Sequence, residues 1–84
     1  MQNHKSNIGH DIERQLKAVS GIIEAFLDDK RVIAIAEELY HVDWEALVTA
    51  EDELDRLYGD VDVSVRARQG RDSKVLCRGM KRVF

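Results

Sequence analysis

The side chains that could carry chemistry in this chain are three histidines, one cysteine and several runs of carboxylates. His4, His10, His41 and Cys77 are scattered and lack the close pairwise spacing of metal-ligating residues. Consecutive acidic residues, as in "AEDELD", diverge around a helix instead of converging on a substrate. P-loop, GxGxxG and nucleophile-elbow motifs are missing from the sequence. We therefore expect a protein that is not an enzyme, with no metal, no cofactor and no small-molecule substrate.

Basic residues, in contrast, gather near the C-terminus. Residues 1–60 hold six Lys/Arg against fourteen Asp/Glu, a net charge of −8, and residues 61–84 hold seven against two, a net charge of +5. Halves of opposite sign often mark contact with a charged partner or with a second copy of the chain. The candidate binding residues share one expected face of the C-terminal segment: Arg66, Arg68, Lys74, Arg78 and Arg82.

Strands must hold these basic side chains, because the hydrophobic period after Gly59 is 2. Apolar residues alternate with polar ones from Val61 to Ala67, which indicates a strand with one buried face. A turn around Gly70 and a returning strand near residues 74–78 then predict an antiparallel β-hairpin. A two-residue loop at Gly70 would bury Lys74, so we favour an odd-numbered loop, which keeps the cations exposed.

The first sixty residues show helical spacing instead. A 4-3-4-3 pattern predicts a helix that starts between Ser6 and Asp11 and ends near Asp28, built on Ile12, Leu16, Val19, Ile23 and Phe26. A second helix is expected over about 30–41. A third begins after an Asp43 cap and ends at Gly59, and the second and third could also form one kinked helix.

Two features of these expected helices could serve contacts. The far side of the first helix carries three small residues, Ala18, Gly21 and Ala25. They could form an oligomer interface, or Gly21 could simply be a tolerated exposed glycine. Glu51 interrupts the apolar stripe of the third helix, which is formed by Trp44, Leu47, Leu54 and Tyr58. It lies either at the rim of that stripe or against a buried charge partner, for which we expect an arginine from the terminal segment.

Length and composition predict a single α+β domain over 1–84, with two or three N-terminal helices followed by a C-terminal antiparallel β-hairpin. Its parts are a flexible N-terminus (1–10), an acidic helical part (11–58) and a basic hairpin (61–84). With 44% hydrophobic and 35% charged residues, the chain should fold. Such a small domain gains stability from association, so we expect a homo-oligomer. One cysteine, no signal-peptide pattern and no membrane-length apolar run predict a cytoplasmic protein.

Two short segments of the C-terminal part resemble a known family. "VSVR" at 63–66 and "VLCRGMK" at 75–81 are similar to the strand pair of DinI-like SOS-response proteins, which bind a recombinase filament. The resemblance covers about a quarter of the chain. Those proteins begin with a strand and end with an acidic helix, whereas here the helical part comes first. No functional residue is carried over.

The charge pattern predicts macromolecular binding, and three hypotheses stay open. In the first, the arginine-rich hairpin contacts nucleic acid or an acidic protein surface. In the second, the acidic helices bind a basic protein surface, as a nucleic-acid-mimicking inhibitor or adaptor from a phage or mobile element would. In the third, the charges serve only homo-oligomer assembly.

Overall fold

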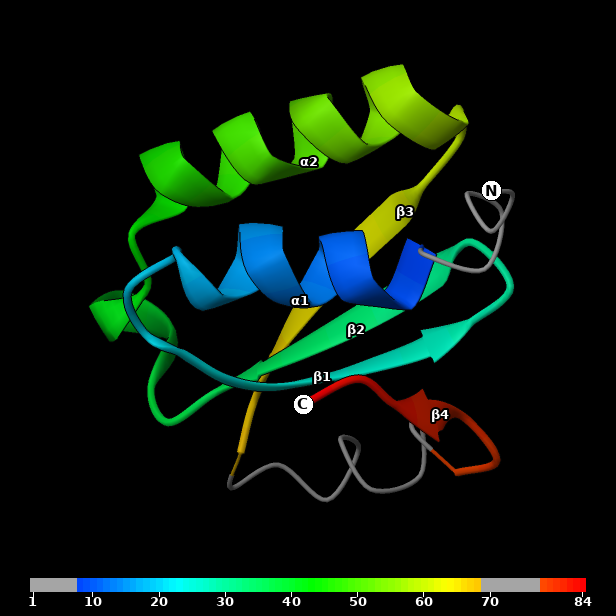
Figure 1. The fold of residues 1–84 in the computed structure, drawn as a ribbon. Coiled ribbons are helices and arrows are strands. Elements are labelled where there is room, and N and C mark those ends of the chain that lie inside the picture. The colour runs from blue at the N-terminus through cyan, green and yellow to red at the C-terminus, as the bar shows by residue number, and fades with distance from the viewer. Residues whose placement is uncertain (1–7, 69–77) are drawn as a thin grey trace.

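The computed structural model describes residues 8–68 and 78–84, which form two α-helices and a four-stranded sheet (Figure 1). The α-helices are α1 (Ile8–Lys17) and α2 (Trp44–Tyr58), and a short 3-10 helix, η2 (Leu39–His41), precedes α2. The strands are β1 (Ile22–Asp28), β2 (Arg31–Ala36), β3 (Asp62–Ala67) and β4 (Lys81–Arg82). No helix within the described ranges is long and apolar enough to cross a membrane.

The sheet is mixed, with the strand order β3-β2-β1-β4. Strand β1 pairs antiparallel with β2 on one side and with β4 on the other, whereas β2 and β3 run parallel, with η2 and α2 in the connection between them. The expected order of helices followed by a C-terminal hairpin is therefore wrong. Two strands lie between the helices, and among the described residues β3 pairs with β2.

The first expected helix is wrong in its second half because the chain leaves the helical conformation after Lys17. Gly21 has φ +99°, which no helical residue adopts. The β-branched pair Ile22-Ile23 then opens β1, in agreement with the strand preference of such side chains. Helix α1 begins at Ile8, within the predicted range from Ser6 to Asp11.

The helix expected over 30–41 is also wrong. Val32 to Ala36 are five consecutive buried residues, and a continuous buried run is typical of a strand covered on both faces. Val32, Ala34 and Ala36 contact the helices, so Ile33 and Ile35 point to the opposite face of the sheet. A two-residue connection joins β1 to β2, and Asp29 adopts φ 56° in it, a conformation that Asp tolerates better than most residues.

The third expected helix and the first expected C-terminal strand are confirmed. Asp43 caps α2 by accepting a hydrogen bond of 3.2 Å from Ala46 N, and Gly59 ends the helix at φ 72°. The strand predicted from the alternating pattern is β3, with Val63 and Val65 packed against the core. The turn around Gly70 and the start of the returning strand lie outside the described residues.

The core lies between the sheet and the two helices, which cover the same face of it (Figure 1). The sheet contributes small side chains at its centre, such as Ala25 and Ala34, and these let the helices approach closely. The largest fully buried side chains are Ile12, Leu16, Leu54 and Val32. Burying one such side chain stabilises the fold by about 1.5–3 kcal/mol, so this shared core holds α1 and α2 against the sheet.

Two contacts between distant segments fix the start of α2. A Cβ atom at Gly21 would lie 2.6 Å from His41 O and 2.8 Å from Val42 Cα, so only glycine fits there. The neighbouring Ser20 carbonyl accepts a hydrogen bond of 3.0 Å from Asp43 N. The turn before β1 is thereby tied to the connection between η2 and α2, which positions the first turn of α2.

Candidate functional site

The structure does not gather the predicted basic residues on one strand pair. Arg66 lies on β3 and Arg82 on β4, at opposite edges of the sheet. Three inter-strand steps of about 4.8 Å separate these strands by roughly 14 Å. Arg78 is exposed in the turn that precedes β4, and Lys74 lies outside the described residues. The continuous cationic face expected from a hairpin is therefore missing from the part of the chain that the structure describes.

Two of these arginines pair with carboxylates of the chain itself. Arg68 Nη1 lies 3.2 Å from Glu37 Oε1, and Arg82 Nη2 lies 3.2 Å from Glu24 Oε2. Both ion pairs are exposed to solvent, so each contributes about 0–1 kcal/mol to stability. The charge of these arginines is partly balanced at short range, which weakens the case for a phosphate-binding face.

The three small residues expected at an oligomer interface do not share a helical face. Ala18 is exposed in the turn after α1, Gly21 packs against the His41 backbone, and Ala25 is fully buried in β1. The close backbone approach that Gly21 was expected to allow does occur. It takes place within the subunit, between two loops, and not between two helices.

Glu51 is half-buried on α2. In the described ranges, no Lys or Arg forms an ion pair with it, so the arginine expected from the terminal segment is not seen there. Its position follows from the rotation of α2, whose buried residues are Leu47, Ala50 and Leu54. Glu51 lies next to this buried stripe, which agrees with the expectation of a residue at its rim.

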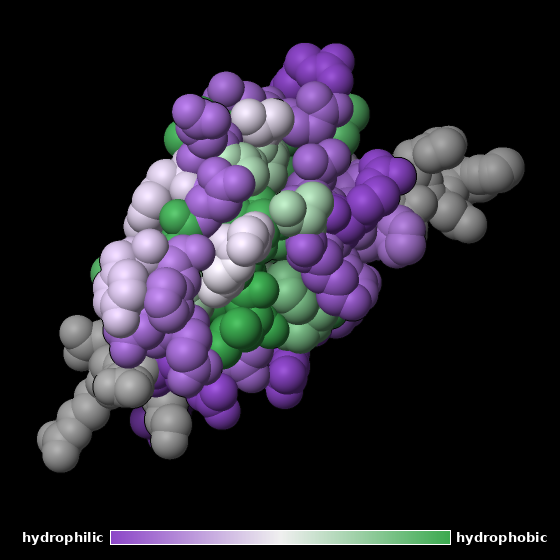
Figure 2. Space-filling view, turned by 90° about the vertical axis from the view of Figure 1, so that its left-hand side faces the viewer, coloured by the Kyte–Doolittle hydropathy of each residue, from purple (hydrophilic) through white to green (hydrophobic). Residues whose placement is uncertain are grey.

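A different group of side chains stands out at the start of α2. Leu39, Tyr40, Trp44 and Val48 leave 43%, 78%, 47% and 53% of their surface exposed, on η2 and the first two turns of α2. Figure 2 views the molecule from this end and shows hydrophobic side chains open to solvent, with hydrophilic ones around them. Exposed aromatic and aliphatic residues that occur together on a small protein mark an interaction site more often than scattered single ones do.

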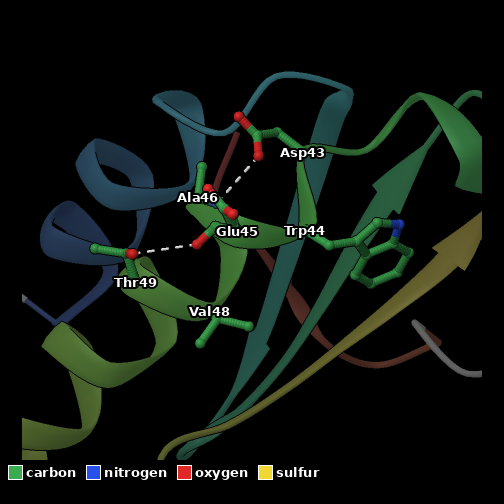
Figure 3. A pocket seen from close by; sticks show the side chains of 6 residues that line it. All are labelled: Asp43, Trp44, Glu45, Ala46, Val48 and Thr49. Carbon is green, nitrogen blue, oxygen red and sulfur yellow. Dashed lines mark hydrogen bonds between the residues drawn. The ribbon is translucent and has the colours of Figure 1, made fainter.

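Two of them, Trp44 and Val48, border a shallow, open hollow of about 670 Å³ along one side of α2. Trp44 and Val48 project from successive turns of the helix, with Asp43, Glu45, Ala46 and Thr49 completing the lining (Figure 3). The capping bond from Ala46 N to Asp43 holds the first turn, and Thr49 Oγ1 donates a hydrogen bond of 3.1 Å to Glu45 O. The lining therefore stands on a regular, capped helix rather than on a loop.

Carboxylates continue the same side of α2 beyond Val48. Glu51, Asp52 and Asp55 follow Trp44 by seven, eight and eleven residues, spacings that return to one side of a helix. We use the name acidic-apolar surface for this set: Leu39, Tyr40, Trp44, Glu45, Val48, Glu51, Asp52 and Asp55. Helix α2 carries five acidic residues and one basic residue, Arg56, whose Nη2 pairs with Glu53 Oε2 at 2.5 Å.

Metal-ligating side chains do not gather among residues 8–68 and 78–84. No set of three or more His, Cys, Asp or Glu side chains there is arranged to hold a metal ion. His41, for example, contacts the ring of Tyr40 edge-on, with ring centroids 4.5 Å apart.

Comparison with known proteins finds no relative of this chain. No protein family, curated protein or solved structure matches this chain. The second segment that resembles DinI-like proteins, 75–81, lies partly outside the described residues, so the strand pair is not tested. What the protein does must therefore be inferred from its own surface.

Proposed function

We propose that this protein acts by binding another protein, and that its acidic-apolar surface binds a cationic segment with apolar anchors. The observation that carries the proposal is the exposure of Tyr40, Trp44 and Val48 beside a row of carboxylates on α2. It follows the hypothesis in which the acidic helices, and not the arginines, form the working surface.

The apolar part of the surface supplies affinity. Trp and Tyr are the residues that most often dominate binding energy in protein interfaces, because each buries a large area with few rotatable bonds. Trp44 is held on a capped helix and still leaves 47% of its surface exposed. A partner that covers Trp44 and Val48 gains this area without first having to order the residues that provide it.

The carboxylates supply selectivity for a cationic partner and increase its rate of association. Glu45, Glu51 and Asp52 form no ion pair with a described Lys or Arg, so their field is directed outward. Such a field attracts a cationic partner and repels phosphates, and its effect declines as salt increases. A Lys- or Arg-rich segment fits this surface, whereas a nucleic acid does not.

Trp44 makes the proposal directly testable, because it is the single tryptophan of the chain. Its fluorescence should change on titration with a synthetic amphipathic peptide of Leu, Lys and Ala, and the affinity should decrease with added salt. A matched acidic peptide of Leu, Glu and Ala should cause no change. An unchanged Trp44 emission with the cationic peptide, or equal responses to both peptides, would overturn the proposal.

Two variants with the same change in charge locate the contact. Val48 and Leu57 are 53% and 48% exposed on α2, and their spacing of nine residues places them on opposite sides of the helix. Val48→Asp should weaken peptide binding about tenfold or more, as expected for a lost interface anchor. Leu57→Asp should bind within about twofold of the original protein. Equal losses in the two variants would contradict the assigned surface.

A further inference from the structure

Strand β3 forms one edge of the sheet. It pairs with β2 on one side, and on its outer side no strand lies among the described residues. Asp62 N donates to Lys30 O at 2.9 Å and Arg68 N to Ala36 O at 2.7 Å, so the backbone groups of even-numbered residues face β2. Because these groups alternate in direction along a strand, those of Val63 and Val65 face the open edge.

A side-chain contact agrees with this assignment. Arg66 Nη1 donates a hydrogen bond of 3.3 Å to Val65 O, a carbonyl on the open edge. Apart from this bond, the described residues provide no partner for the outward-facing backbone groups of this six-residue strand, and such an edge is a template for another strand. The question is which strand fits it.

The sequence of the edge is complementary to itself in the antiparallel direction. From Asp60 to Arg68 it reads "DVDVSVRAR", with Ser64 at the centre. If two copies pair about Ser64, Val63 lies opposite Val65 of the second copy, and Asp62 lies opposite Arg66 of the second copy. Every apolar residue then meets an apolar one, and every acid meets a base.

The two faces of the strand agree with this register. Val63 and Val65 pack toward the helices, so Asp62 and Arg66 both project from the opposite face, where both are exposed. Residues directly opposite each other in an antiparallel pair share a face, so Asp62 can reach Arg66 of the second copy. The backbone direction also fits, because Val63 and Val65 would exchange hydrogen bonds across the edge.

We propose that two copies of this chain pair through the β3 edges, antiparallel about a twofold axis at Ser64, to join their sheets into one. The contact is isologous, so it closes as a dimer instead of growing into a filament. The inner pair of Asp62 with Arg66 carries the specificity, since Arg68 already pairs with Glu37 within its own chain. The proposal stands independently of the function assigned to the acidic-apolar surface.

The competing interpretation is that Asp62 and Arg66 keep the edge apart from other strands, as charged residues on edges commonly do. Light scattering coupled to size exclusion separates the two. We expect a species of twice the 9.6 kDa chain mass. A monomer at concentrations of several hundred micromolar would overturn the proposal.

Charge reversal tests the register itself. Arg66→Asp alone and Asp62→Arg alone should each weaken the dimer about tenfold or more, because like charges then oppose each other twice. Mixing the two variants should give a heterodimer, in which all charges are again complementary, and the double swap in one chain should restore the homodimer. Single variants that dimerise as the original does, or a mixture that stays monomeric, would overturn the pairing.

Circular dichroism should show both single variants folded. Arg31 is the ladder partner of Asp62 in β2, so Asp62→Arg is the variant at greater risk of misfolding. In that case Arg66→Asp, which leaves Asp62 in place, still decides the question. It is expected to be a monomer, and a dimer would overturn the proposal.

Discussion

The hydroxyl of Tyr58, in the last turn of α2, donates a hydrogen bond to Asp11 Oδ2, in the first half of α1. Asp11 Oδ1 also accepts a hydrogen bond of 3.1 Å from Arg14, and the Tyr58 carbonyl accepts one of 3.0 Å from Lys30 Nζ. Residues from α1, α2 and the β1–β2 connection therefore meet at Tyr58. This contact holds one end of the two helices together, while the tie between Ser20 and Asp43 holds the other.

Tyr58→Phe should lower the free energy of unfolding by about 1 kcal/mol, since a hydrogen bond to a partly exposed carboxylate is lost. Burial, followed by the hydrogen bond and the charge of Asp11, raises the pKa of Tyr58 from 10.0 to about 12. A group whose pKa is raised by folding stabilises the protein below its unfolded pKa and loses this effect at higher pH. The difference in free energy of unfolding between the original protein and Tyr58→Phe, measured by urea unfolding, should therefore stay constant below pH 10 and shrink toward pH 12. A difference that grows with pH would contradict this assignment.

Gly21→Ala should destabilise the protein by about 2 kcal/mol or more, because a Cβ atom would meet His41 O at 2.6 Å and the residue keeps a positive φ. Gly9→Ala is the matched control. Gly9 lies in α1 with no atom within 4 Å of its Cβ position, so alanine should stabilise the helix by about 0.5–1 kcal/mol. Thermal unfolding of the two variants should shift in opposite directions, and a shift in the same direction would be inconsistent with the close approach.

Leu54→Ala and Leu57→Ala make the same chemical change three residues apart on α2. Leu54 is fully buried, so its truncation should cost about 2–5 kcal/mol through lost contacts and a cavity. Leu57 is 48% exposed, so its truncation should cost less than about 1 kcal/mol. Equal losses in chemical denaturation would show that α2 is rotated differently on the sheet.

The sequence predicted α2 and β3 well because both carry local signals. Asp43 and Gly59 mark the two ends of α2, and the alternation from Val61 to Ala67 marks β3. The first helix was predicted to be longer than it is, because Ile23 and Phe26 by coincidence continue the helical spacing that begins at Ile12. A glycine followed by two β-branched residues at 21–23 was the available sign of a strand.

Strand pairing could not be predicted from the sequence because it depends on contacts between residues that are distant along the chain. The alternating pattern shows that β3 has a buried face, but it does not show that β2 is its partner. The two strands are distant in sequence, since Val63 pairs with Val32, thirty-one residues earlier. Likewise nothing local indicates that Arg82 pairs with Glu24 across the β1–β4 edge. For this reason the described part of the chain lacks the expected cationic face, while Lys74 lies outside the described residues.

The acidic-apolar surface was missed for a simpler reason. Trp44 falls at helical spacing with Leu47 and had been counted with the buried stripe. In the structure, Leu47, Ala50 and Leu54 face the sheet, and this rotation turns Trp44 and Val48 toward solvent. An i, i+4 pair of large apolar residues continued by carboxylates was the signal that could have indicated it.

The most direct test of the central claim, that the acidic-apolar surface is the working surface, is a two-dimensional ¹⁵N–¹H NMR titration with the cationic amphipathic peptide. Each backbone amide reports separately, so the contact is located without mutation. We predict that the largest shifts cluster at Tyr40, Trp44, Val48 and Asp52, and that they fade as salt is added. Shifts confined to Arg66 and Arg82, or no shifts at saturating peptide, would contradict the account.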